Sequence, residues 1–140
     1  MTEQAAKTDW NNDPDLSDTW KFRFAFFDKY GTPSLFSAKH PAWEALKTFP
    51  WEDKLKINAN IWAFFFSFIY LAILGLIPQA VLLFGVIVAL GIVSAVLPEN
   101  VVIEAFFNFV GFVLAAYTAR MTNIWYYRKR VQGISEWTLK

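Results

Sequence analysis

The chain has 140 residues, of which 56% are apolar, and a formal net charge of +1. This length suits one small domain or membrane unit, and the near-neutral charge gives no basic field for nucleic acid, so no nucleic-acid partner is expected. The sequence has no cysteine, which excludes disulfides, thiolate catalysis and thiolate metal sites.

The N-terminal stretch is polar. Residues 1–16 are rich in Asp, Asn, Thr and Gln and show no periodic apolar pattern. Such a segment cannot bury enough apolar surface to offset the entropy of ordering, so residues 1–16 are predicted to form a disordered tail. The stretch also lacks a basic region followed by an apolar one, so no cleaved signal peptide is expected.

An aromatic helix is predicted to follow this tail. Ser17 suits the N-cap of a helix that continues to Tyr30, and Gly31 suits its C-terminal end. Aromatic side chains recur along it at helical spacing, and the stripe that they form either packs on the next helix, lies on the bilayer surface or binds a partner. The candidate partner-binding residues of this stripe are Trp20, Phe24, Phe27 and Tyr30.

Two further helix starts complete an N-terminal helical region over residues 17–60. Pro41 and Pro50 each suit the beginning of a helix. His40 is the only histidine, and without nearby carboxylates it is interpreted as a surface or capping residue rather than a metal ligand. The helix near Pro50 is expected to begin in water and to pass into the membrane near Ile61 without a break.

The longest apolar stretch runs from Ile61 to Leu97 and contains no charged residue and no histidine. As one helix it would be about 55 Å long, against a hydrocarbon core of about 30 Å, so it is predicted to turn near Pro78 and to cross twice. Small residues four apart, Gly91 and Ala95 among them, allow close helix approach. The predicted membrane bundle covers residues 61–131, with helices over 61–77, 78–97 and 101–127, and a C-terminal tail over 132–140.

The third apolar segment carries a stripe of polar and small residues. At 100° per residue its members share one face: Glu104, Asn108, Gly111, Ala115, Thr118 and Thr122. Because unpaired polar groups are costly in lipid, this stripe is predicted to pack against the 61–97 hairpin, and Gly111→Leu is predicted to destabilise the fold. The alternative interpretation is a polar pathway for an ion or small solute.

A basic cluster follows the third segment. Arg128, Lys129 and Arg130 come after three aromatic residues, which is typical of a helix that leaves the membrane at an anionic face, so these side chains are predicted to contact lipid headgroups. Basic residues also precede Ile61, and the rule that positive charge stays inside then requires an even number of crossings, whereas the apolar segments number three. Either the basic tail lies outside or the shortest segment, 61–77, is re-entrant or interfacial. Three crossings with a cytoplasmic N-terminus are slightly favoured.

Three stretches carry a resemblance to a known family. The stretches from Trp20 to Gly31, from Lys56 to Phe66 and from Asn123 to Tyr127 resemble small bacterial inner-membrane proteins of the YigF/YigG type, also described as domain of unknown function 2628. The resemblance covers roughly residues 17–131. It departs at Tyr70, where family members often carry an Arg-Lys pair. The resemblance implies a location in the bacterial inner membrane and supplies no activity and no catalytic residues.

The sequence therefore predicts an all-α membrane protein with a short cytoplasmic helical hairpin followed by three membrane helices. Its expected role is non-enzymatic, as a binding or regulatory subunit whose partners are membrane lipids and another membrane protein or a second copy. The alternative is a subunit of an oligomeric channel or transporter that uses Glu104 and Asn108. Paired carboxylates, a Ser-His pair and metal-ligand spacing are all missing from the sequence, so neither catalysis nor a cofactor is expected.

Overall fold

The computed structural model describes residues 10–33 and 38–140, and every regular element in these ranges is helical. The predicted all-α class is thus confirmed for the described part of the chain. Six α-helices follow one short 3₁₀ turn, in the order η1 Trp10–Asn12, α1 Asp18–Tyr30, α2 Pro41–Lys47, α3 Trp51–Asn58, α4 Ile61–Ile73, α5 Ile77–Val96 and α6 Val101–Gln132.

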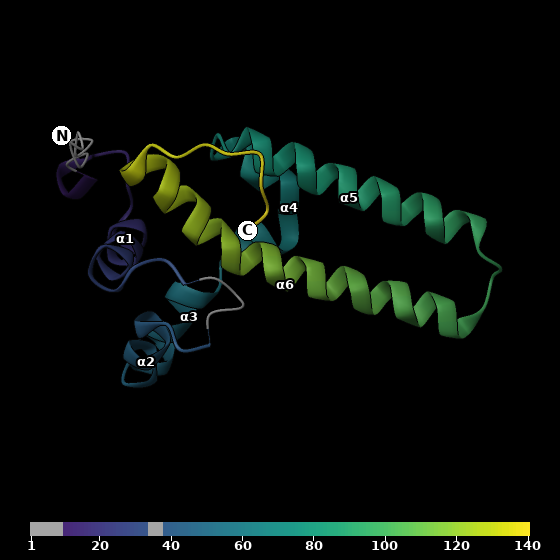
Figure 1. The fold of residues 1–140 in the computed structure, drawn as a ribbon, viewed down its shortest axis with the longest axis horizontal. Coiled ribbons are helices and arrows are strands. Elements are labelled where there is room, and N and C mark those ends of the chain that lie inside the picture. Colours follow the sequence, from purple (N-terminus) through teal and green to yellow (C-terminus); the bar gives the residue numbers. More distant parts are fainter. Residues whose placement is uncertain (1–9, 34–37) are drawn as a thin grey trace.

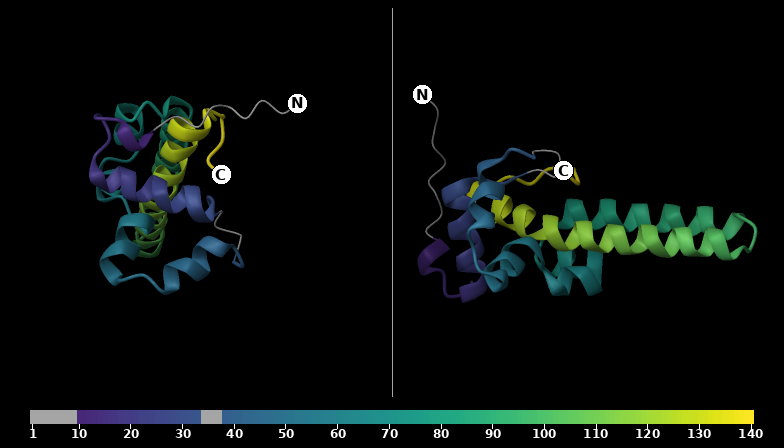
Figure 2. Two further views of the ribbon diagram at one scale, coloured as in Figure 1. Left: turned by 90° about the vertical axis from the view of Figure 1, so that its left-hand side faces the viewer. Right: turned by 90° about the horizontal axis from the view of Figure 1, so that it is seen from below.

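The molecule consists of a long helical arm and a cap of short helices. α5 and α6 run antiparallel and extend together away from the rest of the chain (Figure 1). α1, α2 and α3 gather around the C-terminal half of α6, so that segments from both halves of the sequence lie side by side in the cap (Figure 2). The cap therefore sits at one end of the arm, and the turn between α5 and α6 sits at the other.

The predicted helix starts and stops of the cap are confirmed. The Ser17 side chain caps α1 by accepting from the backbone N–H of Trp20, and α1 ends at Gly31, whose φ is +81°. His40 caps α2 through its Nδ1, which accepts from the N–H of Ala42 at 3.2 Å. These local signals work because capping groups satisfy backbone donors that the first helical turn leaves free.

The predicted disordered tail does not extend to residue 16. Residues 1–9 lie outside the described residues, but Trp10 packs edge-on against Phe24 with 5.9 Å between ring centroids, and Leu16 is buried. Asp13 also forms an ion pair with Arg130. Two large apolar side chains in a polar stretch are enough to hold this segment on the cap, a contribution that its composition conceals.

The predicted continuous helix from Pro50 into the membrane is wrong. α3 ends at Asn58, and Ala59 and Asn60 are extended, with φ of −130° and −127°. The Asn60 side chain then caps α4 by accepting from the N–H of Ala63 at 3.3 Å. Asparagine competes for backbone hydrogen bonds and favours caps over helix interiors, which explains why the helix stops and restarts here.

α4 is short and bent. It ends at Ile73 rather than at the predicted residue 77, which gives a length of about 20 Å, less than the hydrocarbon thickness of about 30 Å. Ser67 interrupts it with a non-helical φ of 50° and ψ of −126°. Figure 1 shows α4 crossing steeply to the two long helices.

Both ends of α4 lie near the same end of α6. Asn60, just before α4, bonds to Asn123, and Gly75, just after it, accepts a hydrogen bond from Lys129. These α6 residues are separated by only about 9 Å along the helix axis. Between these two ends, Phe64 reaches Phe112, with 5.7 Å between ring centroids, about 16 Å further along α6. The chain thus descends along α6, bends at Ser67 and returns.

Three helical stretches are long and apolar enough to cross a membrane: residues 51–73, 77–96 and 101–132. The first of them joins α3 and α4 across their break, so it is not one continuous helix. The other two are α5, whose bounds agree closely with the predicted helix over 78–97, and α6, which starts at the predicted residue 101 but runs five residues beyond the predicted end at 127. α6 ends at Gly133, whose φ is +68°, a left-handed conformation that glycine adopts readily at helix ends.

Candidate functional site

The aromatic stripe of α1 forms part of the core of the cap. Phe24 and Phe27 are almost completely buried, and both rings contact Tyr127 of α6, with 5.6 and 5.5 Å between ring centroids. Trp20 is half-buried against Tyr126. The proposed partner-binding role is therefore wrong for Phe24 and Phe27, because α6 already covers them. The predicted packing on the next helix does not account for these two rings either, because the helix that they contact is α6, about a hundred residues further along the chain.

A buried polar junction holds the break between α3 and α4. The amide group of Asn60 donates to Oδ1 of Asn123 at 3.2 Å, and Nδ2 of Asn123 donates to the carbonyl of Ile57 at 3.0 Å. Both side chains are essentially inaccessible to solvent. The junction satisfies carbonyls at the end of α3 that no longer have helical partners.

Arg23 of α1 completes this junction. Its Nε donates to the carbonyl of Lys56 at 2.6 Å, and its Nη2 donates to the carbonyl of Ala59 at 3.2 Å. Burial lowers the pKa of Arg23 to about 10, so the guanidinium remains charged at neutral pH. No role is predicted from the sequence for Arg23, Asn60 or Asn123. The available signal was a pair of asparagines at the two boundaries of the apolar segments.

The basic cluster at the end of α6 is bonded within the chain. Lys129 donates to the carbonyl of Gly75, Arg130 pairs with Asp13, and Arg128 donates to the carbonyl of Lys140 at 2.9 Å. All three side chains are half-buried. They therefore fasten the α4–α5 turn, the N-terminal segment and the C-terminal tail to α6. Their predicted contact with lipid headgroups stays a prediction.

The polar stripe of α6 divides into two parts. Thr118 and Thr122 are fully buried, and each hydroxyl donates to a carbonyl one turn earlier, those of Leu114 and Thr118. Glu104, Asn108 and Gly111 are exposed, and Ala115 is half-buried. A Cβ added at Gly111 would meet no heavy atom within 4 Å, so the tight packing predicted for this position is wrong.

An open apolar seam takes the place of that packing. Between α5 and α6 lies a cavity of about 420 Å³, which Ser67 at the bend of α4 also lines. Gly91 of α5 is as open as Gly111, with no heavy atom within 4 Å of an added Cβ. The residues that line the seam are Ser67, Ile87, Leu90, Gly91, Ser94, Phe107, Gly111, Leu114 and Ala115.

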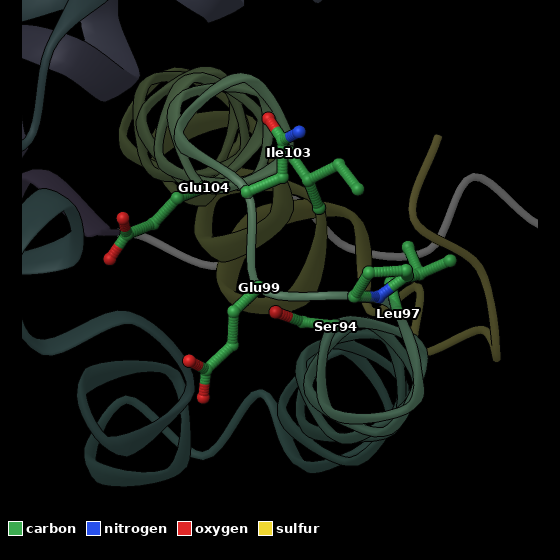
Figure 3. A pocket seen from close by; sticks show the side chains of 7 residues that line it. Ser94, Leu97, Glu99, Ile103 and Glu104 are labelled. Carbon is green, nitrogen blue, oxygen red and sulfur yellow. The ribbon is translucent and has the colours of Figure 1, made fainter.

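A second cavity, also of about 420 Å³, lies at the turn between α5 and α6. In Figure 3 the carboxylates of Glu99 and Glu104 point to the same side of the α5–α6 arm, and the Ser94 hydroxyl lies between α5 and α6. Ser94 lines both this tip cavity and the seam. The two cavities are therefore adjacent, with an apolar part toward the cap and an acidic part at the turn.

The structure separates the two residues assigned to a polar pathway. Glu104 lines the tip cavity, whereas Asn108 lines neither the seam nor the tip cavity. The channel interpretation therefore stays a prediction. Within residues 10–33 and 38–140, no three His, Asp or Glu side chains lie close enough together to hold a metal ion.

Comparison with known proteins places the chain among bacterial relatives. Residues 4–131 match the family described as "Protein of unknown function (DUF2628)". The chain is 38% identical over 131 residues to "Uncharacterized protein YigF" of Salmonella typhimurium and 37% identical to the protein of that name in Escherichia coli strain K12. Each alignment covers 94% of this chain and 98% of the relative. No solved structure matches the chain.

Proposed function

The chain belongs to the DUF2628 family of proteins of unknown function, and from this membership we propose that it is a small integral protein of the bacterial inner membrane that binds a membrane component, protein or lipid, and catalyses no reaction. The observation that carries this proposal is the open seam of the α5–α6 arm. The arm projects away from the cap, and its outer faces are apolar and exposed, as lipid-facing surfaces are.

The seam supports a binding role because close packing is the normal state of a folded interior. Facing side chains of two adjacent helices usually interdigitate, and an unfilled gap forfeits their dispersion contacts. Here α5 and α6 leave a cavity of about 420 Å³ flanked by two open glycines. That volume lies within the range of ligand sites in proteins. In a bilayer, a gap of this kind is occupied by a lipid chain or by part of another protein.

Two crossings, by α5 and α6, are the topology that fits the proposal. α4 is shorter than the hydrocarbon core and returns to the end of α6 from which it set out, which supports a re-entrant helix rather than a crossing. The packing of α1 on Tyr126 and Tyr127 also supports placing both chain ends on one side. This arrangement removes the conflict between three apolar segments and the basic residues at both ends, and by the positive-inside rule the cap is cytoplasmic.

A pair of photo-reactive side chains tests the binding role. Phe107 lines the seam, whereas Phe109 on the same helix is exposed on the outer surface. Each is replaced in turn by benzoylphenylalanine in the full chain, and the cells are irradiated. The tagged protein is then purified, and the masses of its adducts are measured by mass spectrometry. Position 107 is expected to give one discrete adduct, and position 109 a mixture that reflects bulk lipid. Indistinguishable adducts at the two positions would overturn the proposal.

A further inference from the structure

We propose that the seam and the tip cavity together form the binding site of a single phospholipid whose headgroup carries a primary ammonium. Its acyl chain lies along the seam, and its ammonium group lies between the carboxylates of Glu99 and Glu104. This inference deepens the proposed function, on whose topology it rests. The tip of the arm then faces the periplasm, so the lipid comes from the periplasmic leaflet.

The shape of the site favours a chain-like occupant over a helix. α5 and α6 contact each other directly, and a turn of only a few residues joins them at the end of the arm away from the cap. Inserting a third helix between them would require an interaxial distance of about 16–20 Å, because each helix pair needs 8–10 Å. A flexible acyl chain needs no such separation. The side chains of Ile87, Leu90 and Phe107 give it an apolar wall.

The charge of the site selects the headgroup. Glu99 and Glu104 both line the tip cavity, and their carboxylates project to the same side of the α5–α6 arm (Figure 3). The sequence from residue 76 to residue 116 contains no Lys, Arg or His, and no described residue pairs with either carboxylate. Glu104, in the first turn of α6, is favoured by the helix dipole, but Glu99 lies in the connecting turn, outside any helix.

The same charge argues against an anionic lipid and discriminates between ammonium groups. Two carboxylates repel a headgroup with net negative charge, whereas an ammonium group is attracted to both of them. A primary ammonium also donates charge-assisted hydrogen bonds, which a quaternary ammonium cannot do. Because Ser94 lines both cavities, the acidic tip cavity directly continues the apolar seam. A phospholipid, with a polar headgroup joined to an apolar chain, requires this arrangement.

The test uses three phospholipids that carry the same photo-reactive acyl chain. The full-length protein is reconstituted in vesicles of neutral choline lipid that contain a small fraction of photo-reactive ethanolamine, choline or glycerol phospholipid. After irradiation, labelled residues are mapped by mass spectrometry. The ethanolamine lipid is expected to label residues that line the seam about ten-fold more than the glycerol lipid, the scale of one charge-assisted contact.

Variants separate the two parts of the site. Glu99→Gln with Glu104→Gln is expected to reduce ethanolamine-lipid labelling of the seam to the level of the glycerol lipid. Gly111→Phe fills the seam and is expected to abolish seam labelling by all three lipids. Glu136→Gln, an exposed acid on the C-terminal tail, is the matched control and should change nothing. Circular dichroism of each variant checks that its helices remain formed.

Several outcomes would overturn the lipid proposal. Equal seam labelling by all three lipids, or labelling that the Gln substitutions leave unchanged, would show that the carboxylates select no headgroup. A protein adduct at position 107, whether to a second copy or to another protein, would reject the lipid and leave the proposed binding function standing. Adducts at position 107 that match those at position 109 would reject both proposals.

Discussion

Asn60 and Asn123 join two parts of the chain that lie 63 residues apart, through a buried hydrogen bond of 3.2 Å between Nδ2 of the first and Oδ1 of the second. One asparagine begins α4 and the other lies within α6. Their bond fixes the position along the α6 axis at which α4 starts. Lys129 bonds to the carbonyl of Gly75 just after α4, so polar contacts to α6 hold both ends of the bent helix, in addition to its packing on α5 and α6.

Asn123→Ala is expected to destabilise the protein by about 1–3 kcal/mol, because it leaves the buried Asn60 amide and the carbonyl of Ile57 without a partner. Thermal unfolding in detergent, followed by circular dichroism, measures the change. Asn108→Ala is the control, since Asn108 lies on the same helix but is exposed. Equal shifts in Tm for the two variants would contradict the structural role of the junction.

The proposed topology is testable with single cysteines, because the chain has none of its own. Thr19→Cys and Ser135→Cys are expected to react with a membrane-impermeant thiol reagent only after the cells are permeabilised. Glu99→Cys, at the opposite end of the arm, is expected to react in intact cells. All three positions are exposed in the structure. Labelling of position 135 from outside would instead support three crossings.

Gly75 and Gly111 are expected to respond in opposite directions to alanine. Gly75 has φ of +75°, and an added Cβ would lie 2.6 Å from the Lys129 ammonium, so Gly75→Ala should cost about 1–2 kcal/mol for the backbone alone. Gly111 is helical and open, so Gly111→Ala should be neutral or stabilising by up to about 1 kcal/mol. Both changes are read from denaturation midpoints in detergent. A loss of stability at Gly111 would show that α5 and α6 pack more closely than the seam allows.

Phe24→Ala is expected to cost about 3–5 kcal/mol, because the ring is fully buried between α6 and the N-terminal segment. Limited proteolysis of the protein in detergent should then cut within the cap. Phe65→Ala is the matched control, since Phe65 is 70% exposed on α4. If Phe24→Ala left the cap resistant to protease, the α1–α6 interface would not hold the cap together.

The features of the fold that depend on local chemistry could be predicted from the sequence. Ser17, Gly31 and His40 cap helices through contacts with residues close in sequence, so their types and spacing are sufficient to predict them. The bend at Ser67 could not be predicted in this way. Neither glycine nor proline marks it, and α4 packs against α5 and α6, which lie later in the sequence and which local patterns do not report.

The seam shows a different limit of sequence reasoning. The residues from Glu104 to Thr122 that form the polar stripe recur at helical spacing, but periodicity does not say how closely that face of the helix meets its neighbour. Thr118 and Thr122 are buried, whereas Gly111 faces open space. The basic residues at both ends of the apolar segments require an even number of crossings, whereas these segments number three, and the proposed re-entrant α4 would remove this mismatch.

The contact between α1 and the end of α6 also constrains how the protein is made. Phe24 and Phe27 can contact Tyr126 and Tyr127 only after the ribosome has synthesised about a hundred further residues. During that interval the aromatic face of α1 lacks its native cover, and such a surface is prone to aggregation or to capture by chaperones. The cap therefore assembles last, after the arm has been synthesised, and a chain that ends before residue 126 would leave α1 uncovered.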